Sequence, residues 1–245
     1  MMEFVGTATP LSEADIAEAA ARLGIEPAVV AAVAEVESAG GGFLTDKRPK
    51  ILYEAHIFSR LTAHRYDASH PNISAPAWNR SLYGASGAHQ YDRLHQAMKL
   101  DRPAALQSAS WGRFQILGQN YSIAGFQTVE AFVAAMCDGE ADHLQAFISF
   151  CAARDIIRHL ATHDWRAFTK VYNGPGQVDH YAQKIAEAYQ RHAASSVSQP
   201  VTAVSPRDTI KRVQEAIGAT SDGVFGPRSR AKLNEVLRAA GQPPL

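Results

Sequence analysis

The sequence has no excess of charge of one sign, little cysteine and no long apolar run. Its 245 residues include 24 Lys and Arg against 24 Asp and Glu, which argues against a strongly basic, nucleic-acid-binding protein. The two cysteines, Cys137 and Cys151, cannot build a disulfide framework, and we expect two buried, reduced thiols. No run approaches the roughly 18 apolar residues of a membrane span, and residues 1–9 lack the cationic end and apolar stretch of an export signal. We therefore expect neither membrane insertion nor an export signal.

The chain does contain enough apolar sequence for a sizeable core, arranged mainly with helical spacing. Hydrophobic residues make up 46% and charged residues 20%, as in ordinary soluble globular proteins. Ser12, with Asp15 three residues later, begins a predicted helix that ends before Gly24. A second helix, predicted to pack antiparallel to the first, starts at Pro27 and ends in the glycines at 40–42. Four valines share one of its faces: Val29, Val30, Val33 and Val36.

The rest of the first 192 residues is also predicted to be mainly α, with at most a small β element. Residues 49–58 are apolar without a clear period and indicate a strand that turns into a helix. Residues 67–86 contain clusters of Asn, Pro, Ser and Gly, which are typical of a long surface loop. Helical spacing returns in residues 87–100, 104–109 and 129–162, and in the last of these we expect two helices broken near Gly139.

A change in composition indicates a short C-terminal module. Residues 193–206 are small, polar and proline-containing, which is typical of a linker between a domain at 1–192 and a module at 207–245. The last 41 residues carry a net charge of +3, so the remainder carries −3. The neutral whole therefore combines two parts of opposite sign, and a basic module suits an anionic polymer.

Glu37 is the most informative acidic residue. It follows Val33 by four residues, at the edge of the apolar face and near the end of the second predicted helix, whereas Glu35 points elsewhere. Partial burial and the negative end of the helix dipole both favour the protonated carboxyl group. A glutamic acid that is protonated near neutral pH can act as a general acid and protonate a leaving oxygen. From position alone, a Glu that faces water at a frayed helix end is the commoner outcome.

Three fragments, in this order, favour the general acid. The chain leaves Glu37 through Ser38 and a glycine-rich exit at 39–42, which lets a bulky polymer approach the backbone. Trp-Gly-Arg-Phe-Gln-Ile follows at 111–116 and Val-Tyr-Asn-Gly-Pro-Gly at 171–176. Together they resemble the lysozyme-like superfamily of goose-type lysozymes and soluble lytic transglycosylases, with its Glu-Ser, Gly-x-x-Gln and Tyr-Asn-Gly-x-Gly motifs. Ile-Leu-Tyr-Glu-Ala-His-Ile-Phe, at 51–58, is similar to the matching segment of the N-acetylmuramidases of bacteriophage endolysins.

The resemblance covers roughly residues 10–192. It implies a two-lobed, lysozyme-like catalytic domain that cuts the β-1,4 bond between N-acetylmuramic acid and N-acetylglucosamine in peptidoglycan. Glu37 resembles the catalytic general acid, and Glu54 resembles the second acidic residue of the family. The substrate-binding residues implied are Gln115, Tyr121, Tyr172 and Asn173. For Tyr121, packing between the lobes is an equally good alternative to stacking on a sugar ring.

Glu54 separates two mechanisms. A hydrolytic glycosidase normally needs a second carboxylate, either to activate water or to act as nucleophile. If Glu54 faces the same cleft as Glu37, hydrolysis follows. If a buried Arg or Lys pairs with Glu54, a lytic transglycosylase is favoured, in which the muramoyl C6 hydroxyl attacks and leaves an anhydro product. Retention or inversion on hydrolysis depends on the carboxyl separation, roughly 5 to 5.5 Å against 6.5 to 9.5 Å.

Metal chemistry has little support. His159 and His163 have the i, i+4 spacing that would place them on one helix face, with Asp164 adjacent. However, there is no His-Glu-x-x-His and no cysteine pair at ligand spacing. We expect no metal and no organic cofactor, and no motif marks Cys137 as a nucleophile.

The C-terminal module carries a resemblance of its own. Two predicted helices, at 209–218 and 228–239, flank a turn at 221–227 that is expected to hold Phe225 against them. The turn, with its Asp-Gly-x-Phe-Gly-Pro pattern, resembles that of the peptidoglycan-binding domain of many cell-wall hydrolases, although an obvious first helix is missing. A helical pair docked on the catalytic domain is the alternative.

These patterns together predict a modular, monomeric endolysin. The resemblance implies synthesis in the bacterial cytoplasm without a signal peptide, action on peptidoglycan in the periplasm, and a holin as functional helper. A phage structural protein that binds the wall without cutting it is the alternative from another class, and the presence of both Glu37 and Glu54 argues against it.

Overall fold

The computed structural model describes residues 3–38, 41–198, 206–222, 224–240 and 242–243. The chain divides into two compact units, Met1–Ser196 and Val197–Leu245. Three parts of the sequence predictions lie outside the described residues: Ala39 and Gly40 of the glycine-rich exit, 199–205 of the linker, and Gly223 of the C-terminal turn. None of the described helices has both the length and the apolar character that a membrane crossing requires.

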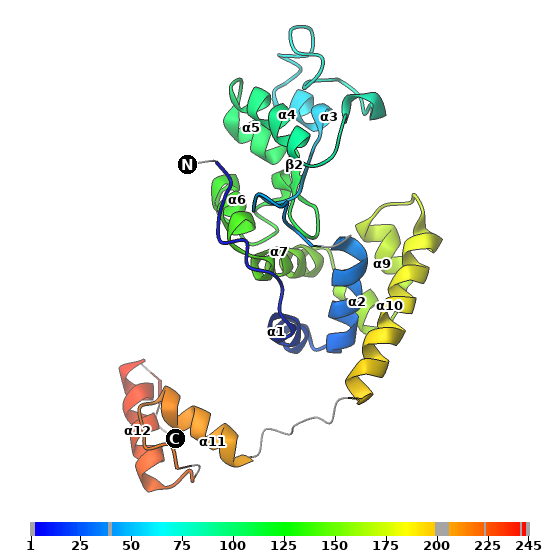
Figure 1. Ribbon diagram of the computed structural model, residues 1–245. Coiled ribbons are helices and arrows are strands. Elements are labelled where there is room, and N and C mark those ends of the chain that lie inside the picture. The colour runs from blue at the N-terminus through cyan, green and yellow to red at the C-terminus, as the bar shows by residue number, and fades with distance from the viewer. Residues whose placement is uncertain (1–2, 39–40, 199–205, 223, 241, 244–245) are drawn as a thin grey trace. The chain divides into compact units, whose positions relative to one another are not determined.

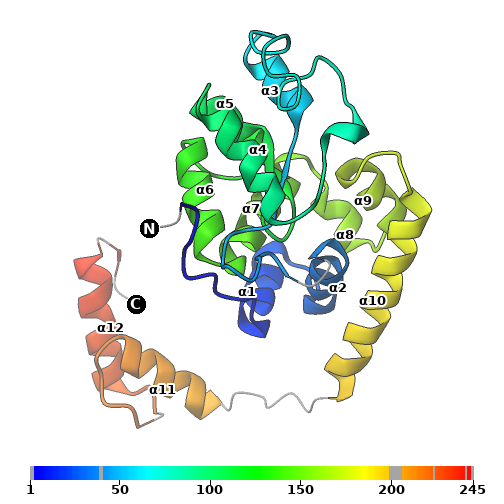
Figure 2. The ribbon, with the colours of Figure 1, turned by 45° about the horizontal axis from the view of Figure 1, so that its top comes forward.

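The first two helices form where their capping residues predict. Helix α1 (Glu13–Leu23) starts with a capping box between Ser12 and Asp15 and ends at Gly24, whose φ of 65° is left-handed. Helix α2 (Pro27–Ser38) buries Val29, Val30 and Val33. The two helices are in contact, but their axes cross steeply in Figures 1 and 2 and are not antiparallel. Helix α1 also packs on α7 (Glu140–Ala153), and this second contact helps to set the direction of the α1 axis.

A three-stranded antiparallel sheet is the small β element. Its order is β1 (Ile51–Tyr53), β2 (Ala109–Trp111) and β3 (Ile116–Leu117). Ser110 is the central residue, opposite Leu52 on one side and Leu117 on the other. Helix α3 (Ala55–Leu61) begins two residues after β1, which confirms the predicted change from strand to helix.

Helices make up most of the remainder of the first unit. They are the 3-10 helix η1 (Arg80–Leu82), α4 (Ala88–Met98), α5 (Arg102–Gln107), the 3-10 helix η2 (Gly118–Asn120), α6 (Val129–Asp138), α8 (Ile157–Ala161), α9 (Trp165–Tyr172) and α10 (Val178–Ser198). The predicted break at Gly139 is present between α6 and α7. In Figures 1 and 2, α3, α4 and α5 lie at one end of the unit and α1, α2, α9 and α10 at the other, which corresponds to two lobes.

The core of this unit is formed by large aromatic and aliphatic side chains. Trp111, Tyr53 and Tyr91 are fully buried, and the ring of Phe4 packs 5.5 Å from that of Trp111. The N-terminal segment is therefore part of the core, and its Thr9 forms a bridge to Gly139. Cys137 and Cys151 are buried, free thiols, as predicted from their apolar surroundings.

Helix α10 extends beyond the predicted domain end at residue 192. It continues to Ser198, so the first six residues of the predicted linker, 193–198, are helical rather than extended. Alanines favour a helix, and Ser195 donates from its hydroxyl to the carbonyl of Arg191 one turn earlier. The boundary between the two units falls between Ser196 and Val197, within the last turn of this helix.

From Pro206 onward, the described residues of the second unit form two helices and a turn. Helix α11 (Pro206–Ala216) and helix α12 (Pro227–Ala239) lie close to the predicted ranges. Buried Gln214 connects them, because its Nε2 donates to Asp222 Oδ1 at 2.7 Å and to Ser229 Oγ at 2.8 Å. The turn is thus held by a buried amide, and Phe225 within it is half-buried.

Candidate active site

Glu37 lies in the last turn of α2 and is partly buried. Burial raises the pKa of Glu37 from 4.5 to about 7, because the charged carboxylate loses solvation. The side-chain amide of Asn173 donates to Oε1 and Oε2 at 3.2 Å each, and this acts in the opposite direction. Asn173 is the C-cap residue of α9, so the end of one helix holds the acid at the end of another.

An apolar wall adjoins Glu37. The ring of Tyr172 stacks on Phe168 at 5.4 Å, and its hydroxyl donates to the carbonyl of Phe114 at 2.7 Å. Burial, with the charge of Glu37 as the second cause, raises the pKa of the Tyr172 hydroxyl well above its ordinary value. The same two causes raise the pKa of the Cys151 thiol. The structure therefore brings the predicted residues Glu37, Tyr172 and Asn173 together.

Glu54 follows β1 and occupies the N-cap position of α3, with a side chain that is 16% exposed. The hydroxyl of Tyr83 donates to Glu54 Oε2, and Nδ1 of His56 lies 3.3 Å from the same oxygen. Among the described residues, no Arg or Lys lies within ion-pair distance of this carboxylate. The core ion pair that would favour a transglycosylase is thus not observed there.

Gln115 lies in the turn between β2 and β3. Its own φ is 49° and that of Gly112 is 69°, so the turn has two left-handed positions. Its side-chain Nε2 donates to the carbonyl of Gly112 at 2.9 Å and to that of Lys50 at 3.2 Å. The amide fastens the turn to the residue before β1, while the side chain stays exposed.

Tyr121 follows η2 and is partly buried against the core. This position fits the alternative in which Tyr121 has a packing role and does not stack on a sugar ring. In the described part of the chain, neither Tyr121 nor Glu54 forms a hydrogen bond, ion pair or ring contact with Glu37, whereas Asn173 is hydrogen-bonded to it.

A buried polar cluster next to α2 was not predicted. Glu140 is 4% exposed and accepts hydrogen bonds from the backbone of Gly42, from the backbone of Leu11 at 3.0 Å and from Arg113 Nη1 at 2.6 Å. Burial alone would raise the pKa of Glu140, but these donors and the charge of Arg113 hold it below the ordinary value. The cluster therefore ties the N-terminal segment, the chain after Glu37 and the β2–β3 turn together.

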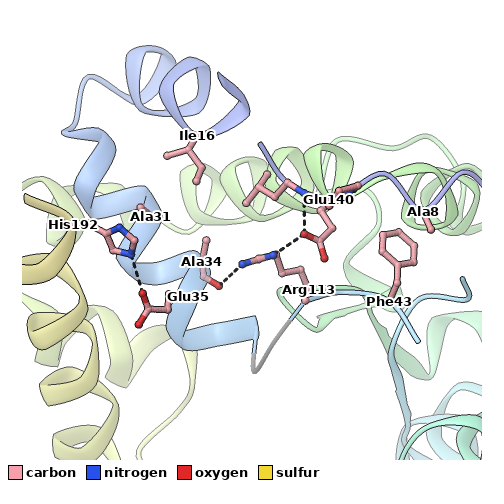
Figure 3. Close-up of a pocket in the computed structure, with 12 residues that line it drawn as sticks. Ala8, Ile16, Ala31, Ala34, Glu35, Phe43, Arg113, Glu140 and His192 are labelled. Atoms are coloured by element: carbon pink, nitrogen blue, oxygen red, sulfur yellow. Dashed lines mark hydrogen bonds and ion pairs between the residues drawn. The ribbon is translucent and has the colours of Figure 1, made fainter. Parts of the chain in front are cut away.

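Arg113 extends this cluster to α2 itself. Figure 3 shows its side chain between Glu140 and Ala34, and Nη2 donates to the Ala34 carbonyl at 3.3 Å. The ring of His143 accepts from the backbone N–H of Arg113 at 2.9 Å. A Cβ on Gly42 would lie 2.6 Å from that ring, so the position requires glycine. The Gly-Arg pair in the 111–116 fragment was the one sequence signal for this contact.

A surface pocket of about 610 Å³ lies beside this cluster and not beside the acid. Its walls include Ala31, Ala34 and Glu35 of α2, and Glu37 is not among the described residues that line it. Figure 3 shows Glu35 directed to His192 of α10, with Nε2 at 2.9 Å. Glu35 and Glu37 thus belong to different faces of the helix, as their spacing predicts.

The histidine pair weighed for zinc does not share a helix. Helix α8 ends at Ala161, and His163 beyond it has a φ of 55° and stacks on Trp165 at 5.1 Å. Within the described residues, no three His, Cys, Asp or Glu side chains gather in a group that could hold a metal ion.

Comparison with known proteins identifies the family. Residues 26–193 match the model of the N-acetylmuramidase family. The crystal structure of the Burkholderia AP3 phage endolysin is similar to this chain, with 39% identity and a TM-score of 0.71, over 76% of this chain and 72% of that one. No curated protein matches. The chain therefore belongs to the N-acetylmuramidase family, which confirms the expected mainly α, lysozyme-like fold and the function of a phage endolysin that cleaves peptidoglycan.

Proposed function

We propose that the chain is a glycoside hydrolase that cuts the bond between N-acetylmuramic acid and N-acetylglucosamine, with Glu37 as general acid. The observation that carries this proposal is the partly buried position of Glu37 at the end of α2, where Asn173 holds both carboxylate oxygens and burial raises the pKa to about 7. At neutral pH such a group is about half protonated, so it can give its proton to the leaving glycosidic oxygen. An ordinary surface glutamate would already be ionised.

Asn173 and Tyr172 assist this transfer in different ways. The amide of Asn173 faces both oxygens of Glu37 and stabilises the carboxylate that remains after the proton leaves. The ring of Tyr172, held by Phe168 and by the carbonyl of Phe114, keeps water from one side of the acid.

Glu54 is proposed as the second carboxylate, which activates water or attacks the anomeric carbon. Its Oε2 accepts a hydrogen bond from Tyr83 and contacts His56, and its partial exposure gives substrate access. No Arg or Lys of the described residues lies within ion-pair distance of Glu54, which favours hydrolysis over transglycosylation, although the charge of the buried Arg93 also acts on Glu54. Gln115 is proposed to line the cleft with its exposed side chain, whereas the core contacts of Tyr121 favour a packing role.

The second unit is proposed to bind the wall. Its net positive charge suits an anionic glycopeptide polymer, and Gln214 holds the turn that resembles those of wall-binding modules. By the same resemblance, we propose a monomer that works without a metal or organic cofactor. It would act on periplasmic peptidoglycan after a holin has disrupted the membrane.

The direct test compares Glu37→Gln with Glu35→Gln. Both replace a carboxylate on α2, but Glu35 pairs with Arg191 and His192 on another face. Glu37→Gln should keep the circular dichroism spectrum of the wild type and lose almost all clearing of purified sacculi, while Glu35→Gln keeps its activity. Wild-type turnover by Glu37→Gln would refute the assignment. Mass spectrometry of the wild-type digest identifies the reaction, because hydrolysis leaves reducing-end muramic acid and transglycosylation leaves the anhydro form.

A further inference from the structure

Trp78 is an exposed aromatic side chain that is nevertheless held in place. It is 61% exposed and is the one aromatic among the large exposed hydrophobic side chains of the described residues. Its Nε1 donates to the hydroxyl of Tyr83 at 2.8 Å, and the two rings lie 6.3 Å apart. The indole is thus largely exposed to solvent while its N–H is held by Tyr83.

A second hydrogen bond connects Tyr83 to Glu54. Tyr83 accepts from Trp78 and donates its own proton to Glu54 Oε2. Burial and the charge of Glu54 raise the pKa of the Tyr83 hydroxyl, so it remains a donor at neutral pH. Since both contacts of the carboxylate, from Tyr83 and from His56, go to Oε2, no described residue donates to Oε1. Oε1 is the oxygen left for water or substrate.

The segment that carries both aromatic residues is anchored from behind. Gln90 is buried, and its Nε2 donates to the carbonyls of Tyr83 at 2.7 Å and Ala85 at 2.8 Å. Its Oε1 accepts from the backbone N–H of Tyr53, the residue before Glu54. One buried amide therefore sets the position of the loop relative to the carboxylate.

Several polar side chains surround Glu54. A small pocket beside it is lined by Glu54, His56, Asn79, Tyr83 and Arg93, and Trp78 is the chain neighbour of Asn79. In Figures 1 and 2 the loop with η1, in teal, lies on the side of the unit where α9 ends. Asn173, which holds Glu37, caps that end of α9.

We propose that Trp78 is a binding platform for one N-acetylated hexopyranose ring of the glycan strand, and that Tyr83 is the positioning residue that orients Glu54 beneath it. The apolar C–H face of the pyranose would cover the indole, while one of its hydroxyl groups would reach Oε1 of Glu54. An exposed aromatic ring held by a hydrogen bond loses little conformational freedom on binding. This inference rests on the proposed role of Glu54 and adds a subsite to it.

The platform is tested by tryptophan fluorescence in the full-length Glu37→Gln protein, which binds without cutting. The probe is a purified tetrasaccharide of alternating N-acetylglucosamine and N-acetylmuramic acid. The chain has three tryptophans; Trp111 is fully buried and Trp165 is partly buried, and none lies in the second unit. We expect a saturable emission shift that Trp78→Phe abolishes and the control Trp165→Phe retains.

Affinity gives a second readout. Trp78→Ala should weaken tetrasaccharide binding by about tenfold in calorimetry, as expected for losing one covered aromatic face. An emission shift that persists in Trp78→Phe, or an affinity within twofold of the parent in Trp78→Ala, would overturn the platform.

The positioning role is tested by steady-state kinetics on the same tetrasaccharide, in the chain with Glu37 intact. Tyr83→Phe keeps the ring and removes the donor to Glu54, so kcat should fall about tenfold with KM within twofold. Trp78→Ala should show the reverse split, with KM raised and kcat largely kept. Parallel losses in both parameters for both variants, or an unchanged kcat in Tyr83→Phe, would refute the positioning role. Retained activity in Glu37→Gln would instead refute the general acid, and the binding titration would still report on Trp78.

Discussion

The amide of Asn173 donates to both carboxylate oxygens of Glu37, at 3.2 Å each, across 136 residues of sequence. This contact lowers the pKa of Glu37 against the larger effect of burial, which raises it. The balance of the two sets the pKa of about 7, and each side of that balance can be changed separately.

Removing the amide should move the pH profile of the reaction. In Asn173→Ala the pKa of Glu37 rises above about 7, so the alkaline limb of the kcat profile shifts to higher pH. The acid is then weaker and its carboxylate less stabilised, and kcat at the optimum should fall about tenfold. Asn72→Ala is the matched control, since the Asn72 amide donates to Gln96 at an exposed site. An alkaline limb that stays in place or moves to lower pH would contradict this account.

Glu37 should also destabilise the first unit at neutral and alkaline pH. Because the pKa of Glu37 is raised on folding from 4.5 to about 7, its contribution to stability is fully present below pH 4.5 and is lost as the pH rises through 7. Glu37→Gln should therefore be more stable than the wild type at pH 8 by about 1 to 3 kcal/mol, with the difference vanishing near pH 4. Urea unfolding followed by tryptophan emission measures this in the first unit. A difference independent of pH would show that ionisation of Glu37 is not the cause.

Breaking the cluster around Glu140 should destabilise the first unit strongly. Glu140→Gln leaves the guanidinium of Arg113, whose side chain is 17% exposed, without its counter-charge. Loss of one member of a buried pair costs about 3 to 5 kcal/mol, which corresponds to a melting temperature lower by roughly 10 °C. The matched control is Glu130→Gln, because Glu130 pairs with Arg102 while 49% exposed, and it should change stability by less than about 1 kcal/mol. Equal effects of the two variants in calorimetry would refute a special role for the buried pair.

The second unit should contribute to binding and not to bond cleavage. A chain that ends at Ser198 should retain kcat on soluble oligosaccharides and bind sacculi more weakly, with the larger loss at low salt, where its charge is least screened. Gln214→Leu in the full chain removes the donor to Asp222 and Ser229 and should weaken sacculus binding in the same direction. Unchanged pelleting with sacculi by both variants would show that the unit does not bind the wall.

Elements specified by neighbouring residues were predictable. The capping box of Ser12 and Asp15, the left-handed Gly24, the break at Gly139 and the change from β1 to α3 are all local in the sequence. The crossing of α1 and α2 was not predictable in this way, because it depends on how α1 packs against α7. The helical continuation of α10 to Ser198 was also missed, since small polar residues are compatible with both a linker and a helix.

The sequence by itself determined the family, the mainly α fold and Glu37 as the candidate acid, because these depend on short motifs and on helical spacing. Only the tertiary structure decided what surrounds each carboxylate: Asn173 at Glu37, Tyr83 at Glu54 and Arg113 at Glu140. The physical reason is that burial and hydrogen bonding set the protonation of a carboxyl group. Both arise from residues that are distant in the chain and meet only when the chain folds.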